Sequence, residues 1–422
     1  MGKTLTWLLL GLGALLFLLA ADDELVRRGR VIAANSGHPL KDAIVTLDEV
    51  VARTDSDGNY QVRGNAVQLG VRVYGYERTQ IHLAPHQESV EDVRLKPFPP
   101  KALYLSFYGI GSRTLRESAL ELLETTELNA LVIDVKGDRG NISYMSAIPL
   151  AGRIGAQEVI TIKDIDFLLR SLHEKGIYTI ARMVVFKDEP LASARPDLAV
   201  KLPSGAVWSD KEGLSWTDPF KKEVWDYNIA VAVEAAQHGF DEIQFDYLRF
   251  PDARGLVFSM PNTEVNRVKA IAEFLQTARQ KLTRYNVFLA ADLFGYVCWN
   301  LDDTGIGQTL ESVSQDLDYL SPMLYPSGFQ AGIPGFSDPV AHPYEIVYRS
   351  LVRARERSGV ATVRFRPWLQ AFRDYGFDRR PYTGREIMQQ IKGAEDFGSN
   401  GWMLWNPRNE YSSEGLRSIG GK

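Results

Sequence analysis

From residue 102 onward, short apolar runs alternate with segments in which apolar residues recur every three or four positions. Such runs are typical of buried parallel strands, and the segments between them are typical of amphipathic helices. The pattern predicts eight strands, at residues 102–109, 130–137, 178–186, 242–250, 287–295, 318–326, 365–372 and 401–407. A helix is expected after each strand, and the last is a short one at 412–419. The order of these units is that of a (βα)₈ TIM barrel, which we predict for residues 102–420.

A doubly wound open sheet is the main rival to the barrel. That fold needs a glycine-rich phosphate-binding turn after its first strand. The corresponding segment here, "SFYGIGS" at 106–112, does not match G-x-G-x-x-G. The barrel therefore remains the preferred fold.

The pattern before residue 102 is different. Residues 26–95 contain short strand candidates divided by turn residues, which predicts a small all-β sandwich. The segment "DSDG" at 55–58 favours a hairpin turn over a calcium loop, because the downstream ligands of such a loop are absent. Residues 96–101, "KPFPPK", are rich in proline and are interpreted as a linker between the two domains.

The N-terminus has the features of a targeting segment. Lys3 precedes an apolar run over residues 5–21, and acidic residues follow it. This pattern predicts an export signal within residues 1–21. An uncleaved membrane anchor through residues 5–21 is the alternative, because the run is close to the shortest that spans a bilayer. Either way, the working part of the protein is expected outside the cytoplasmic membrane.

Composition excludes several classes of function. The 422 residues carry a formal net charge of -5 without a run of Lys and Arg, which argues against a nucleic-acid partner. Cys298 is the only cysteine, and none of the six histidines forms H-x-H or H-E-x-x-H. The sequence therefore predicts no histidine or cysteine metal centre and no cofactor. Metal-dependent hydrolysis by carboxylates alone stays open.

Polar residues gather where the predicted barrel strands end. In TIM barrels, the active residues lie at the C-terminal ends of the strands. A buried charge at such a position is costly unless it is paired or used. Each residue alone is equally well explained by a structural role, but their concentration at one end favours a site. The candidates are Asp134, Lys136, Arg182, Asp246, Arg249, Asp292, Tyr325, Trp368, Gln370, Trp405 and Asn406.

Two of these candidates suggest the chemistry. Asp246 and Asp292 end neighbouring predicted strands, and their environments can separate their pKa values into one charged and one protonated group. Aromatic residues at or just past the strand ends suit the C–H faces of sugars. These are Tyr108, Tyr247, Tyr296, Trp299, Tyr325, Trp368 and Trp405. Trp208 and Trp216, in a long insertion at 187–218, are expected to line a groove for a chain-like substrate.

Five motifs, in order, carry a resemblance over residues 101–415. They are "LVIDVKGDRGNISY", "ARMVVFKDEPLA", "FDEIQFDYLRFP", "DYLSPMLYPSGF" and "GWMLWNPRNEY". Together they resemble a bacterial family of glycoside hydrolases first catalogued as a domain of unknown function. The patterns "GRVIAANSGHPLKDAIVTL" and "ARTDSDGNYQV" resemble the carboxypeptidase-regulatory-like β-sandwich modules of secreted proteins.

The family resemblance implies a sugar-cleaving TIM barrel with a carbohydrate substrate and a two-carboxylate mechanism. Asp246 would be the nucleophile or the stabilising carboxylate, and Asp292 its acid/base partner. Lys136, Arg182 and Arg249 would orient Asp246 or keep it ionised. Tyr325, Gln370, Trp405 and Asn406 would hold the sugar.

A more distant likeness is to chitinase-type barrels. "GFDEIQFDYL" is similar to their strand-four motif, "MLY" to their M-x-Y and "GWMLW" to their strand-eight tryptophan. Leu248 stands where those enzymes carry the general-acid Glu, and Gln244 replaces one of their aspartates. These departures argue against the substrate-assisted mechanism of chitinases for this chain.

The sequence thus predicts an exported glycoside hydrolase acting on a polysaccharide or envelope glycan. One alternative is a non-catalytic carbohydrate-binding or cell-envelope scaffold. A second is another carboxylate enzyme on the same barrel, such as a lyase or a metal-dependent hydrolase, because the fold alone does not determine the reaction.

Overall fold

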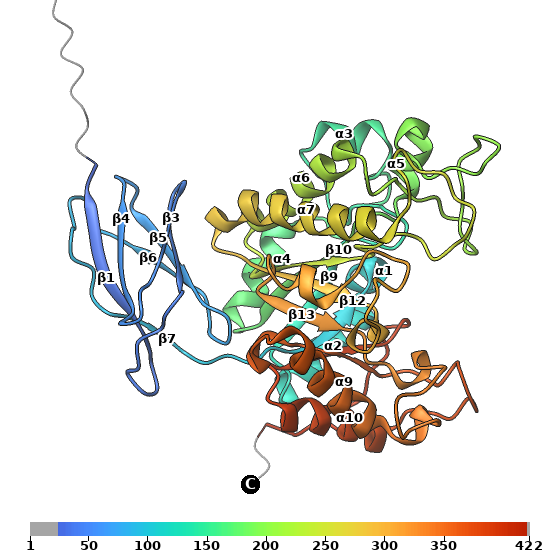
Figure 1. The fold of residues 1–422 in the computed structure, drawn as a ribbon. Coiled ribbons are helices and arrows are strands. Elements are labelled where there is room, and N and C mark those ends of the chain that lie inside the picture. Colours follow the sequence, from blue (N-terminus) through green and yellow to red (C-terminus); the bar gives the residue numbers. More distant parts are fainter. Residues whose placement is uncertain (1–23, 420–422) are drawn as a thin grey trace, which may run out of the picture.

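The computed structural model describes residues 24–419, and it begins with the all-β region that the sequence predicts. Two small sheets face each other there (Figure 1). One has the order β4 (Asn59–Arg63), β1 (Val26–Ala33), β7 (Val93–Leu95). The other has the order β3 (Val50–Arg53), β2 (Ile44–Leu47), β5 (Gln68–Arg72), β6 (Thr79–His82). Val31, Val45 and Val71 are buried between them, so the two sheets share one apolar core.

The expected export segment, residues 1–21, lies outside the described residues. Between residues 24 and 419, no helix combines the length and the apolar character that a bilayer crossing requires.

An eight-stranded parallel sheet follows, in the order β13-β12-β11-β10-β9-β8-β15-β14. Its strands are β8 (Lys101–Leu105), β9 (Ala130–Lys136), β10 (Tyr178–Val184), β11 (Glu242–Asp246), β12 (Phe288–Leu293), β13 (Tyr319–Pro322), β14 (Trp368–Gln370) and β15 (Trp402–Trp405). The first and last strands of this order also meet. The Arg366 N–H donates to the Leu320 carbonyl at 2.9 Å, and the Leu324 N–H to the Trp368 carbonyl at 3.0 Å. These bonds close the sheet, and the predicted TIM barrel is confirmed.

Helices surround the barrel on its outer side (Figure 1). They are α1 (Phe107–Gly111), α2 (Arg113–Thr125), α3 (Pro149–Arg153), α4 (Ile165–Glu174), α5 (Glu189–Ala194), α6 (Lys222–His238), α7 (Glu264–Leu282), α8 (Leu310–Val313), α9 (Pro343–Ser358) and α10 (Gly384–Phe397). Short 3₁₀ turns cover Pro196–Leu198, Thr283–Tyr285, Gly295–Cys298, Pro326–Gly328, Pro339–Ala341 and Thr362–Arg364.

The prediction of a short helix at 412–419 is wrong. This part of the described chain is irregular and runs beside the end of α2, where the Glu127 N–H donates to the Arg417 carbonyl at 2.7 Å. Gly415 adopts a left-handed φ of 83° and lies against Gly384 at the start of α10. That backbone conformation interrupts a helix, and the pairing with α2 takes its place.

Several predicted strands are too long at their C-terminal ends. The run predicted at 242–250 leaves the sheet after Asp246, and the run at 318–326 leaves it after Pro322. Leu248, Phe250 and Leu324 nevertheless remain buried, because they pack in the loops at the mouth of the barrel. Apolar character alone therefore did not mark where the strands end.

Alternation along β11 sorts side chains between the two faces of the barrel wall. Ile243 and Phe245 point outward, and the Phe245 ring lies 5.3 Å from that of Phe274 on α7. Gln244 and Asp246 point to the interior, since side chains alternate along a strand. Asp246 thus ends the strand on the interior side, at the C-terminal mouth.

The sandwich covers the opposite, N-terminal end of the barrel. Tyr74 and Phe98 pack against the side chains that fill the barrel interior at its N-terminal end. The Phe98 ring lies 5.5 Å from that of Tyr178. The Gly75 N–H donates to the Tyr319 hydroxyl at 2.9 Å. The Phe98 N–H donates to the Gly75 carbonyl, so the proline-rich segment is held against the sandwich. This arrangement leaves the C-terminal mouth of the barrel uncovered by the sandwich.

We expect the Arg78 side chain to make one of the main stabilising contacts between the two domains. Its guanidinium donates to Asp241 Oδ1 at 2.8 Å and to the carbonyls of Gly239 and Asn286. We predict that Arg78→Ala lowers the free energy of unfolding by about 3 kcal/mol at pH 7, because it leaves a largely buried carboxylate without its arginine. Denaturant unfolding measures the loss, and Arg94→Ala, an exposed arginine on β7, is the control.

The effect should depend on pH. Although burial opposes it, Arg78 and then His173 lower the pKa of Asp241 to about 2. A lowered pKa stabilises the fold above the ordinary aspartate range, and this stabilisation disappears as the pH falls toward 2. The unsubstituted protein and Arg78→Ala should therefore have similar free energies of unfolding at low pH. Equal stability at pH 7 would contradict the role given to Arg78.

Candidate active site

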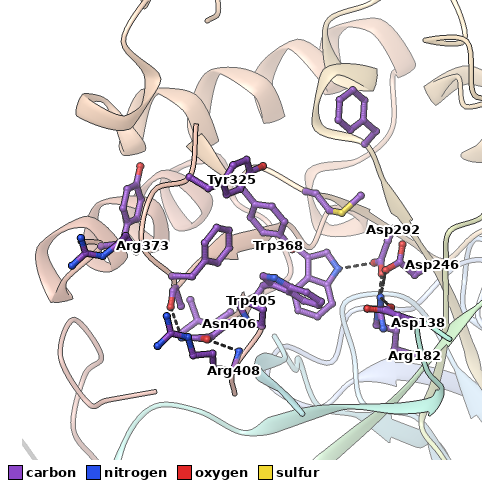
Figure 2. A pocket seen from close by; sticks show the side chains of 18 of the residues that line it. Asp138, Arg182, Asp246, Asp292, Tyr325, Trp368, Arg373, Trp405, Asn406 and Arg408 are labelled. Atoms are coloured by element: carbon purple, nitrogen blue, oxygen red, sulfur yellow. Dashed lines mark hydrogen bonds and ion pairs between the residues drawn. The ribbon is translucent and has the colours of Figure 1, made fainter. Parts of the chain in front are cut away.

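A cavity of about 970 Å³ opens at the C-terminal mouth of the barrel. Arg182, Asp246 and Asp292 lie at one side of it, and the aromatic residues Trp368 and Trp405 lie beside them (Figure 2). These residues come from β10, β11, β12, β14 and β15, so strands distant in sequence build one wall. Most of the polar and aromatic residues predicted at the strand ends therefore line a single concave surface.

Arg182 joins four carboxylates, and it is the centre of the polar wall. Its Nε donates to Asp246 Oδ2 at 2.9 Å, its Nη1 to Asp134 Oδ1 at 2.6 Å and its Nη2 to Asp138 Oδ1 at 2.9 Å. Asp292 Oδ2 lies 3.9 Å from the same Nε. Charge-assisted bonds in fixed directions hold the guanidinium and the carboxylates in one arrangement.

Two rings complete the support of Arg182. The guanidinium carbon lies 5.3 Å from the centre of the Tyr104 ring and 5.5 Å from that of Trp405. These rings stack on each other at 4.3 Å. Arginine favours such aromatic faces, so the packing limits rotation of the side chain.

The backbone after Asp246 is strained in a way that serves this carboxylate. Tyr247 has a left-handed φ of 47°, which is unfavourable for a bulky residue. In this conformation its N–H donates to Asp246 Oδ1 at 2.6 Å. The Tyr247 ring is held by Trp216 at 5.6 Å and by the Lys187 ammonium at 5.1 Å. The insertion at 187–218 therefore packs against Tyr247, the residue that follows Asp246, and holds it in place.

The expectation that Trp208 and Trp216 line a substrate groove is wrong. Trp216 is buried, its Nε1–H donates to Asp210 Oδ2 at 3.0 Å, and Trp208 packs against it. Neither indole reaches the cavity wall. Trp216 instead packs against the Tyr247 ring, and Trp208 packs against Trp216.

Asp292 lies in a different environment from Asp246. It is almost completely buried, and its Oδ1 accepts a hydrogen bond of 2.6 Å from the Trp368 Nε1–H. Burial raises its pKa well above the ordinary aspartate value, and the charge of Asp246 raises it further, against the opposing effect of Arg182. The arrangement therefore favours the protonated form of Asp292.

Asp134 has a supporting position. Its Oδ2 accepts hydrogen bonds from the Tyr104 hydroxyl at 2.8 Å and from the Phe107 N–H at 2.9 Å. Burial raises its pKa to about 6, although Arg182 opposes the shift. Asp134 is buried behind Arg182 and does not line the cavity, so the structure does not bear out a direct substrate contact.

The other candidates divide into two groups. Arg249, Tyr325, Trp368, Trp405 and Asn406 line the cavity as expected. Gln370 does not. Its Nε2 donates to the Ser327 hydroxyl at 2.7 Å and its Oε1 accepts from the Ser327 N–H at 3.0 Å, so it fixes the loop after β13. The expected sugar contact of Gln370 is corrected to a role in holding this loop.

Lys136 points away from the cavity, contrary to expectation. A β-bulge shifts the register between β9 and β10, so that Asp134 lies opposite Arg182 but Lys136 lies opposite Met183. The extra residue reverses the alternation of side chains at the end of the strand. The Lys136 ammonium consequently pairs with Asp188 at 2.6 Å and donates to Asn228 Oδ1 on α6, outside the barrel.

We predict that Lys136→Met destabilises the protein without changing its catalysis. The substitution leaves the completely buried Asp188 without a cation, which costs about 3–5 kcal/mol. The double variant Lys136→Met/Asp188→Asn should recover part of this loss, because it removes the unpaired charge and keeps the side-chain oxygen that caps α5. Chemical denaturation gives the stability. A large fall in kcat/KM of the folded variant would restore Lys136 to the site.

Sequence reasoning missed several residues around the site. Asp138 and Tyr104 contact the Arg182 cluster, and Arg373 and Arg408 line the far side of the cavity (Figure 2). Asp138, Arg373 and Arg408 come two or three residues after the strand ends, so extending the strand-end rule into the loops would have found them. Tyr104 lies inside a strand and carries no such signal.

Within the described residues, no three His, Cys, Asp or Glu side chains are grouped so as to hold a metal ion.

A barrel with an aromatic cavity and two neighbouring carboxylates at its C-terminal mouth is the architecture of many carbohydrate-active enzymes. Residues 102–411 match the family described as "Putative glycosyl hydrolase domain", and the chain belongs to this family. Among curated proteins, none matches the chain.

Several solved structures are similar to this chain. A hypothetical protein from Ruminiclostridium thermocellum is 41% identical over 45% of this chain and 96% of that chain, with a TM-score of 0.41. The glycoside hydrolase domain of PgaB (BpsB) from Bordetella bronchiseptica is 14% identical, covers 74% of this chain and 95% of that chain, and has a TM-score of 0.54. Alpha-L-fucosidase isoenzyme 2 from Paenibacillus thiaminolyticus is 15% identical over 74% of this chain and 47% of that chain, with a TM-score of 0.50.

Proposed function

We propose that the protein is an exported glycoside hydrolase that cleaves a polysaccharide or envelope glycan with two carboxylates. The observation that carries this proposal is the asymmetric pair at the cavity wall. Asp246 accepts hydrogen bonds from Arg182 and from the Tyr247 N–H, whereas burial favours the protonated form of Asp292. Glycosidic cleavage needs one charged and one protonated carboxyl group flanking the same bond.

In this mechanism, Asp292 donates its proton to the leaving glycosidic oxygen. The anomeric carbon gains positive charge as the bond breaks, and the Asp246 carboxylate stabilises that charge or attacks the carbon. Arg182 is a positioning residue, because its bonds to Asp246 and Asp134 keep the carboxylate aimed into the cavity. Water then completes hydrolysis, and Asp292 accepts a proton in return.

Aromatic rings would hold the sugar. Trp405 and Tyr325 line the cavity next to the carboxylates and are partly exposed, and their flat faces match the C–H faces of pyranose rings. Trp368 lies in the same wall but is almost completely buried. The Trp368 indole N–H is occupied by Asp292, which fixes the position of this ring. Arg249 and Asn406 add polar groups to the same cavity.

Membership of the glycosyl hydrolase family and the likeness of fold to glycoside hydrolases support the enzyme over a non-catalytic carbohydrate-binding scaffold. The apolar run before residue 22 supports export.

The direct test is release of reducing ends from a panel of bacterial and plant polysaccharides. The chain lacking residues 1–21 is compared with its Asp246→Asn variant. Release by the unsubstituted chain alone would establish the enzyme and its central carboxylate. Binding of a glycan without any release would identify a scaffold instead. Unsaturated products would identify a lyase, and activity abolished by a chelator would favour a metal-dependent hydrolase.

A further inference from the structure

The loop after β14, residues 371–381, forms a wall of the active-site cavity away from the carboxylates. Figure 2 shows Arg373, in this loop, on the far side of the cavity from Asp246. Phe372 and Tyr375 belong to the same loop and also line the cavity. Neither ring takes part in the pairing of the carboxylates, so this wall needs a separate explanation.

The two rings continue the aromatic surface that begins at Tyr325. Tyr375 and Phe372 are nearly parallel, with an angle of 10° between the rings and 6.0 Å between their centres. Phe372 in turn packs edge-on against Tyr325, at 5.5 Å and 77°. A single exposed aromatic residue is ordinary, but these three are in contact along one cavity wall, and Tyr375 is 49% exposed. The contact sequence leads from the carboxylates to an accessible ring at the far side.

Hydrogen bonds hold the loop in a fixed shape. The buried Asp374 carboxylate accepts a hydrogen bond of 2.6 Å from the Ser327 hydroxyl, which Gln370 also binds. It accepts further bonds of 2.9–3.0 Å from three backbone N–H groups of its own loop, those of Gly376, Phe377 and Arg379. Because this loop is rigid, little conformational freedom is lost when a ligand packs on the ring beside Asp374.

The chemistry of this wall matches a sugar unit. A pyranose ring presents C–H groups on its faces and hydroxyl groups at its edges, so it packs on aromatic rings that have hydrogen-bond donors beside them. Arg373 and Arg408 supply such donors, since both are exposed and line the same side of the cavity. The cavity volume of about 970 Å³ lies at the upper end of the range for pockets that enclose a whole drug-sized ligand. The cavity therefore has room for more than one sugar unit.

We propose that Phe372 and Tyr375 form a distal subsite for a sugar unit of an extended glycan, remote from the bond that is cleaved. The proposal rests on the proposed glycoside hydrolase function and adds the class of substrate, which is a chain of several sugar units and not a short glycoside. The distal unit packs on the Tyr375 ring, and Arg373 donates to its hydroxyl groups. Binding energy gained there positions the chain across the carboxylates, so long substrates are cleaved better than short ones.

The test compares substrates of different length. Oligosaccharides from the disaccharide upward are prepared by partial acid hydrolysis of the polysaccharide that yields the most reducing ends in the panel described above. For the unsubstituted chain, kcat/KM should rise with length until the distal subsite is filled. Tyr375→Ala should lower kcat/KM about fivefold for the longest oligosaccharides, and it should leave the value for the shortest cleaved ones unchanged.

Two further variants are the controls. Tyr375→Phe keeps the ring and should retain the preference for long chains. Phe167→Ala removes an exposed aromatic ring from α4, outside the cavity, and should change kcat/KM at no length. Melting temperatures show whether each variant is folded. An equal loss at every length in Tyr375→Ala would mean that the ring acts through the catalytic groups, and no loss at any length would mean that no sugar packs on it; either result would overturn the subsite.

Affinity electrophoresis in native gels that contain each polysaccharide of the panel separates the subsite from the proposed hydrolysis, because binding needs no turnover. An apparent affinity that falls about fivefold in Tyr375→Ala but not in Phe167→Ala supports the subsite, even without release of reducing ends. In that case the hydrolase fails and the subsite remains, in a glycan-binding protein. Release of reducing ends with no difference between Tyr375→Ala and the unsubstituted chain would keep the hydrolase and overturn the subsite. Absence of both retardation and length dependence would overturn the subsite as well.

Discussion

Replacing Asp246 by asparagine is expected to lower kcat/KM for glycoside hydrolysis by roughly 10³-fold or more, equivalent to about 4 kcal/mol of transition-state stabilisation. Asparagine keeps the shape of the side chain but removes the charge that faces the developing cation. It is also a far weaker nucleophile than a carboxylate. The loss should be mainly in kcat, because the charge is needed in the transition state more than in substrate binding.

Asp252→Asn is the matched control for this result. Asp252 also lines the cavity, but it is exposed and outside the Arg182 cluster, so the same chemical change should alter kcat/KM less than about threefold. Melting temperatures of both variants show whether the fold is intact. A fully active Asp246→Asn protein with an unchanged melting temperature would remove Asp246 from its role.

Replacing Asp292 by asparagine should remove the general acid, with a loss of about 10²–10⁴-fold for natural glycosides. The loss should shrink strongly for aryl glycosides whose leaving group needs no proton. Asparagine can still accept the Trp368 N–H bond, so the position of the indole is preserved. This dependence on the leaving group separates proton donation from a purely structural role.

The pH profile provides the second signature of Asp292. Because burial raises its pKa, the active protonated form is complete below that pKa, and activity falls as the pH rises through it. This basic limb should lie above the ordinary aspartate range and should disappear in Asp292→Asn. A basic limb that persists unchanged in the variant would assign the proton to another group.

Much of the barrel followed from the pattern of apolar residues. Eight predicted strands correspond to eight observed ones, because a strand covered by helices outside and packed inside needs a nearly continuous apolar run. The C-terminal limits did not follow, because Leu248 and Phe250 are buried by the loops and not by the sheet. Asp138 was missed because it lies just beyond β9, in a loop whose start the apolar pattern does not mark.

The placement of Asp246 and Asp292 on neighbouring strands, toward the C-terminal mouth, also followed from the sequence, since each closely follows an apolar run. Lys136 was misplaced because a single bulge in β9 reverses that alternation, and the bulge depends on pairing with β10. Trp208 and Trp216 were misplaced because the path of a long insertion is set by what it packs against, here Tyr247.

The sequence by itself thus determined the two-domain order, the barrel and the two neighbouring strands that carry the carboxylates. These depend on local periodicity, which every short segment expresses. Only the tertiary structure decided that Arg182 joins four aspartates, that Asp292 is buried against Trp368, and that the sandwich covers the N-terminal end of the barrel. Such features arise from contacts between residues far apart in the chain, and desolvation and charge pairing act only after those residues have been brought together.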